Sequence, residues 1–575
     1  MTEAPPPSGN SSVCGRIKHV LELPPAAGEL NSEPDHWKNR DLIPLPPNRR
    51  IWKDVDFIGL WSTVFLTTFG WQATASLLAL GLNIWQAVLC NFIARLFQVV
   101  FVLSMGWPGG VWHIGYSVSS RYAFGVFGGF VPLVLRIGLC TVWYGVQAFT
   151  GGQLLGVILS TIFPTYHNMK NTLPASASMT TKQFVGYVIY NIIVLPLLYI
   201  QPEKLRKPFR YTMILSGLSI IGLSVGLLAG AKGPGDLASI ASNSAHGSKL
   251  GWGFVQGISV ILGSGVVGMS SQSDFSRFAR RPGDQVLGQT LAVMVFGNIV
   301  PVLGLLGTAA ASKMYGDVAE LGLWNPPNIL ELWLDQQYDN PKIRAAAFFA
   351  AVGFLASIIA LNSIENGVSG GMDVAGLAPK YISIRRGSYI LAALSVVIQP
   401  WQIIAKASVF TSVISSFGSI LFPLMGVFTA DYFLIRSKKL KLEDLYTANS
   451  DSIYWFNGGF NWRSFAAWTL GFGFSVPGLV AVDPKYTDII PAGFLHFFYL
   501  SFIAGYLISF TTHWLFSTVF QPRGLGETDR LDSFGTFTPD EAEKLGIEIP
   551  LASEQTSFDE TVGKEASETH SSVIV

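Results

Sequence analysis

The feature that most limits how this chain can fold is a series of twelve long apolar stretches joined by short polar connections. Each stretch is close to the length that an α-helix needs to cross a bilayer, roughly 20 residues. The stretches lack the alternation of β-strands and are too long for barrel strands, so they predict helices. We therefore predict an all-α polytopic membrane protein with twelve transmembrane helices, at about 55–81, 84–105, 127–160, 183–200, 211–231, 252–272, 286–311, 345–366, 388–404, 408–435, 463–482 and 490–519.

The composition agrees with that prediction and excludes several classes of protein. Only 13% of the residues are charged, against about 25% in an ordinary soluble protein. A soluble enzyme, a nucleic-acid-binding protein and a disordered scaffold are therefore excluded. The three cysteines, Cys14, Cys90 and Cys140, are far apart and form no C-x-x-C pair. The sequence thus predicts no disulfide framework, no metal site and no cofactor.

The two ends of the chain differ in composition from the apolar middle. We predict an N-terminal tail at 1–53, a transmembrane domain at 54–520 and an acidic C-terminal tail at 521–575. The C-terminal tail carries twelve acidic and four basic residues, and the N-terminal tail is rich in proline. Both compositions are typical of solvated, largely disordered segments. Such tails are the parts of the chain that ubiquitin and the endocytic machinery would reach.

Basic residues gather in alternate connections between the apolar stretches. Fifteen Lys and Arg residues lie on one side, including the Lys204–Arg210 and Arg277–Arg281 connections, against eight on the other. Connections rich in Lys and Arg stay on the cytoplasmic side of a membrane. With an even number of helices, both termini are then predicted to be cytoplasmic.

Two of the apolar stretches contain residues that favour an interrupted helix. The first holds the polar run Thr67–Gln72 at mid-depth, which includes Gly70, and the sixth holds Gly263, Gly265 and Gly268. Matching interruptions in the two halves of a chain are typical of inverted-repeat transporters with a central binding site. The alternative is close packing of helices through small residues.

Polar side chains within the third and eighth stretches are candidates for binding a ligand. Trp143 and Gln147 are four residues apart and share a helical face, which suits a flat heterocycle bearing N–H and C=O groups, although tryptophan packing and an interhelical amide bond are the alternative. Glu365 and Asn366 are costly at membrane depth and are therefore expected to face the interior. Arg136 is predicted to be a structural partner of loop carbonyls or acids.

Several motifs resemble a known family, the nucleobase:cation symporter-1 family, and in particular its fungal allantoin, uracil and uridine permease branch. The resemblance extends from about residue 35 to 520. The motifs are Asn39-Arg40-Asp41-Leu42-Ile43-Pro44, Arg49-Arg50-Ile51-Trp52, Trp143-Tyr144-Gly145-Val146-Gln147, Asp274-Phe275-Ser276-Arg277-Phe278, Asn366-Gly367-Val368-Ser369-Gly370-Gly371-Met372-Asp373 and Asn461-Trp462-Arg463.

The resemblance implies a fold, an activity and a set of site residues. The fold is LeuT-like, with two inverted repeats of five helices and two further helices, and the activity is ion-driven uptake of purine- and pyrimidine-related compounds or of vitamins such as thiamine at the plasma membrane. By the same resemblance, Trp143 stacks on the substrate, Gln147 and Asn366 bond it, and Gln72 of the broken first helix is the fourth substrate-binding residue. Gly265 stands where many relatives place an aromatic residue or lysine.

The coupling ion is predicted to be a proton. Sodium-coupled relatives place hydroxyl side chains one turn before the substrate asparagine, whereas this chain has Ala360 and Leu361 there. Hard cations need several oxygen ligands, so a sodium site is disfavoured. Glu365 and Asp373 are the nearest carboxylates and the candidates for carrying the proton.

The function predicted from the sequence is therefore secondary active transport by a protein that is not an enzyme. Neither an H-E-x-x-H pair nor a Walker motif is present, which argues against a zinc enzyme and an ATP-driven pump. The substrate is expected to be uracil, allantoin, uridine or a similar heterocycle. A thiamine or nicotinamide riboside transporter of the same family is the alternative, followed by a non-transporting nutrient receptor.

Overall fold

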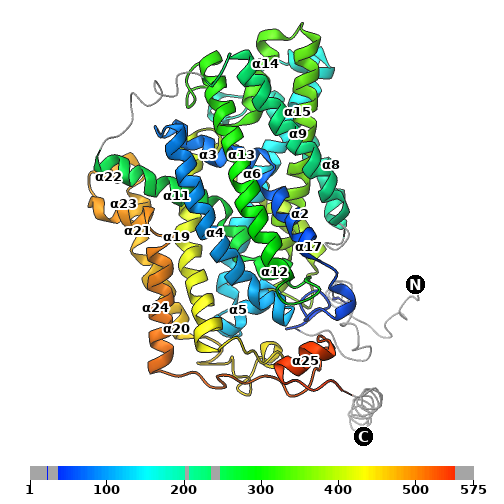
Figure 1. Cartoon of the computed structure of the whole chain (residues 1–575), viewed down its shortest axis with the longest axis vertical. Helices are drawn as coiled ribbons and strands as arrows, with labels where there is room; N and C mark the ends of the chain where they lie inside the picture. The colour runs from blue at the N-terminus through cyan, green and yellow to red at the C-terminus, as the bar shows by residue number, and fades with distance from the viewer. Residues whose placement is uncertain (1–21, 24–35, 201–205, 235–246, 551–575) are drawn as a thin grey trace, which may run out of the picture.

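The computed structural model describes residues 22–23, 36–200, 206–234 and 247–550. Within these ranges the chain is helical, and the only β-pairing consists of isolated bridges. Long helices run roughly side by side along the molecule (Figure 1). This arrangement follows from the apolar stretches, since a helix satisfies all of its own backbone hydrogen bonds where water is absent.

Each of the twelve apolar stretches contains at least one helix. The longer helices are α2 (Asp54–Phe65), α3 (Thr68–Ala79), α4 (Ile84–Trp112), α6 (Phe130–Ile162), α8 (Thr181–Val194), α9 (Arg206–Gly230), α11 (Ser248–Ser270), α13 (Asp284–Tyr315), α15 (Pro341–Leu361), α17 (Ile384–Val397), α19 (Ala407–Thr429), α20 (Trp462–Gly473) and α24 (Ala504–Val519). In the described residues, eight helices are long and apolar enough to cross a membrane, or nine if the bent pair of α23 (Ala492–Tyr499) and α24 is one span. The count of twelve therefore stays a prediction.

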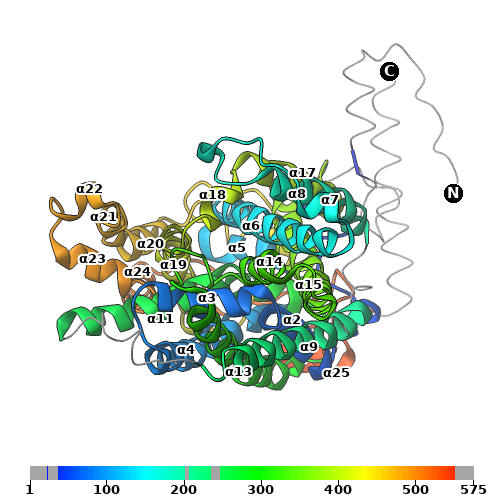
Figure 2. The ribbon, with the colours of Figure 1, turned by 90° about the horizontal axis from the view of Figure 1, so that it is seen from above.

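The helices pack in two groups with a peripheral set outside them. One group contains α2, α3, α4, α11 and α13, and the other contains α6, α8, α15, α17 and the short helix α16 (Ser369–Leu377). Helix α19 packs on α11, and α20 and α24 pack with α19 at the side of the molecule. Figure 2 shows α20, α23 and α24 (orange) at the edge of the view, away from α6, α8 and α17.

The first span is broken where the polar run begins. Helix α2 ends at Phe65 and α3 begins at Thr68, so the break falls at Leu66 and Thr67. The Thr67 hydroxyl then caps α3 by accepting a hydrogen bond from the Gly70 backbone N–H at 3.3 Å. A Cβ atom on Gly70 would lie 2.0 Å from the Phe65 carbonyl oxygen. Only glycine fits this close approach between the two halves of the span.

The interruption expected around Gly265 in the sixth span is wrong. Helix α11 runs without a break from Ser248 to Ser270, and the chain departs from it only at Ser271, before the short helix α12 (Gln272–Ser276). The glycines of α11 serve close packing instead, because a Cβ on Gly263 would lie 2.5 Å from the Ile414 carbonyl oxygen of α19. For this span, the alternative of close helix packing through small residues therefore agrees with the structure.

The expectation that both tails are largely disordered is wrong for residues 36–53 and 521–550. These segments fold onto the end of the molecule that carries Arg121, Arg277 and Arg436, which we call the basic end. There Arg50 forms an ion pair with Glu541 of α25 (Pro539–Leu545), with 2.9 Å between Nη2 and Oε2. Figure 1 shows α25 (red) at this end, opposite α14 (Pro326–Gln337). The remaining tail residues, 1–21, 24–35 and 551–575, lie outside the described ranges.

Candidate functional site

A small cavity lies beside the break in the first span. Its volume is about 50 Å³, well below the roughly 300–1,000 Å³ of pockets that enclose a ligand. Its walls come from α2, α3, α6, α11, α15 and the π-helical turn η6 (Asn362–Val368). The lining residues are Trp61, Val64, Phe69, Trp143, Gln147, Ser264, Gly265, Val267, Gly268, Leu361, Glu365 and Asn366. Trp143, Gln147 and Asn366, three of the four residues predicted to bind substrate, therefore share one cavity with Glu365.

The Trp143 ring is held on several sides by phenylalanines. Phe69, Phe410 and Phe417 stand nearly perpendicular to it, with ring centroids at 4.7, 6.4 and 6.1 Å. The indole Nε1–H of Trp143 is buried and has no hydrogen-bond partner among the described residues. A fixed ring with an unsatisfied donor is suited to a ligand that offers both a flat face and an acceptor.

Two amides of the cavity are arranged to bond a ligand. The Gln147 side chain is buried, and no hydrogen bond joins it to another described residue. Asn366 donates from Nδ2 to Asn362 Oδ1 at 2.9 Å, and Asn362 lies within bonding distance of the Tyr144 carbonyl. The side-chain oxygen of Asn366, Oδ1, is therefore left as an acceptor for a ligand. The π-helical turn η6 brings Asn362 and Asn366 together, and such turns often occur at functional sites.

Glu365 is the carboxylate of this cavity. The side chain is 8% exposed, and its Oε1 atom is buried without a hydrogen-bond partner. Its Oε2 atom lies against Gly268, where a Cβ would come within 3.0 Å of it. The role of Gly268 is therefore to leave space for the Glu365 carboxylate, and not to break the helix.

Asp373, the second predicted carboxylate, lies outside the cavity in a buried ionic cluster. Arg136 of α6 donates from Nε to Asp373 Oδ2 at 2.6 Å and from Nη2 to Asp274 Oδ2 at 3.2 Å. It also bonds the Ser369 hydroxyl at 2.9 Å. The prediction that Arg136 is a partner of acids is confirmed. Because Asp274 belongs to α12 and Asp373 to α16, the cluster joins segments far apart in the sequence.

Gln72 does not line the cavity. Its Nε2 atom donates to Asn325 Oδ1 at 2.6 Å, and Asn325 in turn donates to Gln153 Oε1 at 3.2 Å. These three buried amides connect α3, the start of α14 and α6. The structure thus places Gln72 in a contact between helices at the α14 end, and separates it from Trp143, Gln147 and Asn366.

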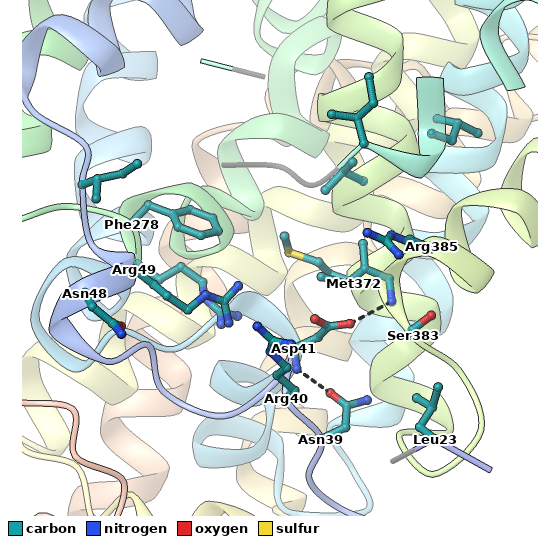
Figure 3. Close-up of a pocket in the computed structure, with 16 residues that line it drawn as sticks. Leu23, Asn39, Arg40, Asp41, Asn48, Arg49, Phe278, Met372, Ser383 and Arg385 are labelled. Atoms are coloured by element: carbon teal, nitrogen blue, oxygen red, sulfur yellow. Dashed lines mark hydrogen bonds between the residues drawn. The ribbon is translucent and has the colours of Figure 1, made fainter. Parts of the chain in front are cut away.

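A larger cavity of about 580 Å³ lies at the basic end, between the N-terminal segment and the helices α16 and α17. Figure 3 shows Asp41 in this cavity, where its carboxylate accepts a hydrogen bond from the Ile384 backbone N–H at 3.2 Å. Val368 and Met372 line this cavity and continue the helical segment that carries Asn366. The two cavities therefore lie on successive turns of the same segment.

Two aromatic residues of the small cavity, Trp61 and Phe69, were not predicted from the sequence. They come from α2 and α3 on either side of the break. They bring aromatic surface to a cavity in which Gly265 offers none. The sequence signal that could have identified them is their position next to the predicted interruption of the first helix.

Comparison with known proteins identifies the family of the chain. A family model described as permeases for cytosine and purines, uracil, thiamine and allantoin matches residues 44–505. The chain belongs to the nucleobase:cation symporter family. It is similar to the transporter aclS of Aspergillus oryzae, with 38% identity over 92% of this chain and 94% of aclS. It is also similar to nicotinamide riboside transporter 1 of Saccharomyces cerevisiae, with 29% identity over 94% of this chain and 89% of that protein.

The fold is shared with a solved transporter. The structure of Mhp1, a nucleobase-cation-symport-1 family transporter in a closed conformation with bromovinylhydantoin bound, matches with a TM-score of 0.65 and 19% identity. The match covers 88% of this chain and 99% of Mhp1. The predicted LeuT-like fold class is confirmed. The protein is a multi-pass membrane transporter of this family and not an enzyme.

Proposed function

We propose that this protein is a proton-coupled symporter that takes up a flat heterocycle, such as uracil, allantoin or uridine, across the plasma membrane. The observation that carries the proposal is the cavity beside the first-helix break, where a fixed Trp143 ring and two amides face a common space. Trp143 stacks on the ring, Gln147 bonds its edge, and the Asn366 carbonyl accepts a ring N–H. The alternative substrates are thiamine and nicotinamide riboside, and the alternative function is that of a non-transporting nutrient receptor.

The small volume of the cavity supports a cycle in which helices move apart to admit substrate. A volume of about 50 Å³ is far below the roughly 300–1,000 Å³ of ligand pockets, so the cavity must widen for a heterocycle. In this proposal the Gln72–Asn325 contact holds α3 against the α14 end while the cavity is closed. The larger cavity at the basic end then receives the substrate on its way out.

The proposed orientation places the basic end in the cytoplasm, because Lys and Arg connections are retained on that side. Both terminal segments then face the cytoplasm. Lys38 and Lys544 lie in these segments and are proposed acceptors for ubiquitin, which would direct the transporter to endocytosis.

The proposed coupling ion is a proton. Ala360 and Leu361 offer no side-chain oxygen at the turn before Asn366, so a sodium shell there would lack ligands. The two buried carboxylates, Glu365 in the cavity and Asp373 in the Arg136 cluster, are the candidate proton carriers. Uptake is then expected to fall as external pH rises.

Tracer uptake in a host that lacks its own permeases tests this proposal. We expect saturable uptake that is lost on adding an uncoupler and is unchanged when sodium is replaced by choline. Competition by uracil, uridine, allantoin, cytosine, thiamine and nicotinamide riboside then ranks the substrates. A sodium requirement at fixed pH would refute the proton assignment, and binding without accumulation would favour the receptor.

A further inference from the structure

The unpartnered carboxylate of Glu365 carries an inference about the substrate. Among the described residues, no side chain forms an ion pair with Glu365 and no donor bonds its buried Oε1 atom. The guanidinium of Arg136 is bonded to Asp373 and Asp274 instead. A buried carboxylate without a partner is costly. The site is therefore incomplete as it stands.

The cavity carries a single ionisable group. Of its twelve lining residues, only Glu365 can be charged, and the polar remainder, Gln147, Ser264 and Asn366, is neutral. When Glu365 is ionised, the cavity therefore has a formal charge of −1. Because the Glu365 side chain is buried, that charge attracts a cation more strongly than it would at an exposed surface.

The other lining side chains suit a cation with a flat apolar body. Trp61, Phe69 and Trp143 place three aromatic rings around the cavity. The faces of such rings attract a positive charge, and aromatic cages are a common way of binding quaternary nitrogen. A quaternary ring nitrogen has no N–H to donate, so it needs a counter-ion rather than a hydrogen-bond acceptor.

We infer that the transported heterocycle has a permanent positive charge in its ring, such as a pyridinium or thiazolium, and that Glu365 is its counter-ion. This inference rests on the proposed function and selects the alternative substrates, thiamine and nicotinamide riboside, over the neutral heterocycles named first there. The Trp143 indole N–H and the Gln147 amide then bond the polar substituents of the ring. With Glu365 assigned to the substrate, Asp373 in the Arg136 cluster is the carboxylate left for the coupling proton.

A pair of ligands that differ only in ring charge tests this assignment. Nicotinamide riboside is a pyridinium cation, and its 1,4-dihydro form is a neutral molecule of nearly the same shape. We would measure the dissociation constants of both by calorimetry on the full-length protein in lipid nanodiscs. The wild type is expected to bind the cation at least tenfold more tightly than the neutral form.

The variant Glu365→Gln keeps the side-chain size and removes the charge. It is expected to weaken binding of the cation by about 10- to 100-fold, while affinity for the neutral form changes less than threefold. Glu365→Asp keeps the charge and is expected to retain the preference with weaker binding. Glu331→Gln is the matched control, because Glu331 pairs with Lys182 on α8, away from the cavity; the preference should be unchanged there.

Two results would overturn the inference. Equal affinity of the wild type for the two ligands would do so without any variant, and so would a charge preference that survives Glu365→Gln. If the wild-type protein takes up a neutral nucleobase but does not bind the cation, the proposed function stands and only the inference is refuted. Absence of saturable uptake of every heterocycle tested would instead reject the proposed function itself.

Discussion

Substitution of Trp143 separates a binding face from simple packing. If the indole stacks on the substrate ring, Trp143→Ala removes one stacking contact, worth about 1–3 kcal/mol for a base on an aromatic side chain. At about 1.4 kcal/mol for each tenfold change, the dissociation constant should rise roughly 5- to 150-fold. Trp143→Phe keeps a six-membered ring between Phe69 and Phe417 but loses the Nε1–H. We expect it to retain transport with affinity weakened roughly 2- to 10-fold.

The assay is apparent affinity for several heterocycles at matched surface amounts of a fluorescent fusion of the full chain. The same two substitutions at Trp333 form the control. Trp333 is 8% exposed, against 5% for Trp143, but lies on α14 outside the cavity. If Trp143 only packs, its variants will behave like those of Trp333, with less protein at the surface and unchanged affinity. That result would remove Trp143 from the site.

Three further substitutions test other residues of the site. Gln147→Glu keeps the size of the side chain but removes its N–H donors, so ligands that need a donor should lose affinity while the others change little; competition with a panel of heterocycles measures this. Asn366→Ala should lower affinity about tenfold or more at near-normal surface amount, because it leaves a polar substrate atom unpaired; normal uptake kinetics would exclude Asn366 from binding. Gly70→Ala places a Cβ 2.0 Å from the Phe65 carbonyl oxygen and should reduce the amount of folded protein, measured by fluorescence-detected gel filtration. Gly59→Ala, with open space around the added Cβ, should leave that amount unchanged.

Local patterns in the sequence were enough to predict much of the fold and part of the site. Helix spacing alone places Trp143 and Gln147 on one face, and the structure brings both to the cavity. The polar run at Thr67 marks the first break because a threonine cap and a glycine act within a few residues. Such local effects can be read without knowing the tertiary contacts.

Features that depend on distant segments could not be predicted in this way. The glycines of α11 fit either a break or close packing, and only the approach of Ile414 from α19 decides between them. Gln72 was predicted to bind substrate, but its side chain donates a hydrogen bond to Asn325, 253 positions later. No local pattern indicates that contact. The ion pair of Glu541 could not be predicted from the acidic composition of 521–550, because its partner, Arg50, lies near the other end of the chain.

The pairing of Arg50 with Glu541 has a consequence for the order in which the protein is completed. The two residues are 491 positions apart, and Arg50 is 2% exposed in the finished structure. At about 5–20 residues per second, a ribosome needs roughly 25–100 s to synthesise the intervening chain. The Arg50–Glu541 pair can therefore form only after the helices between the two residues have been made, and an early stop codon before Glu541 would leave the buried guanidinium without that carboxylate.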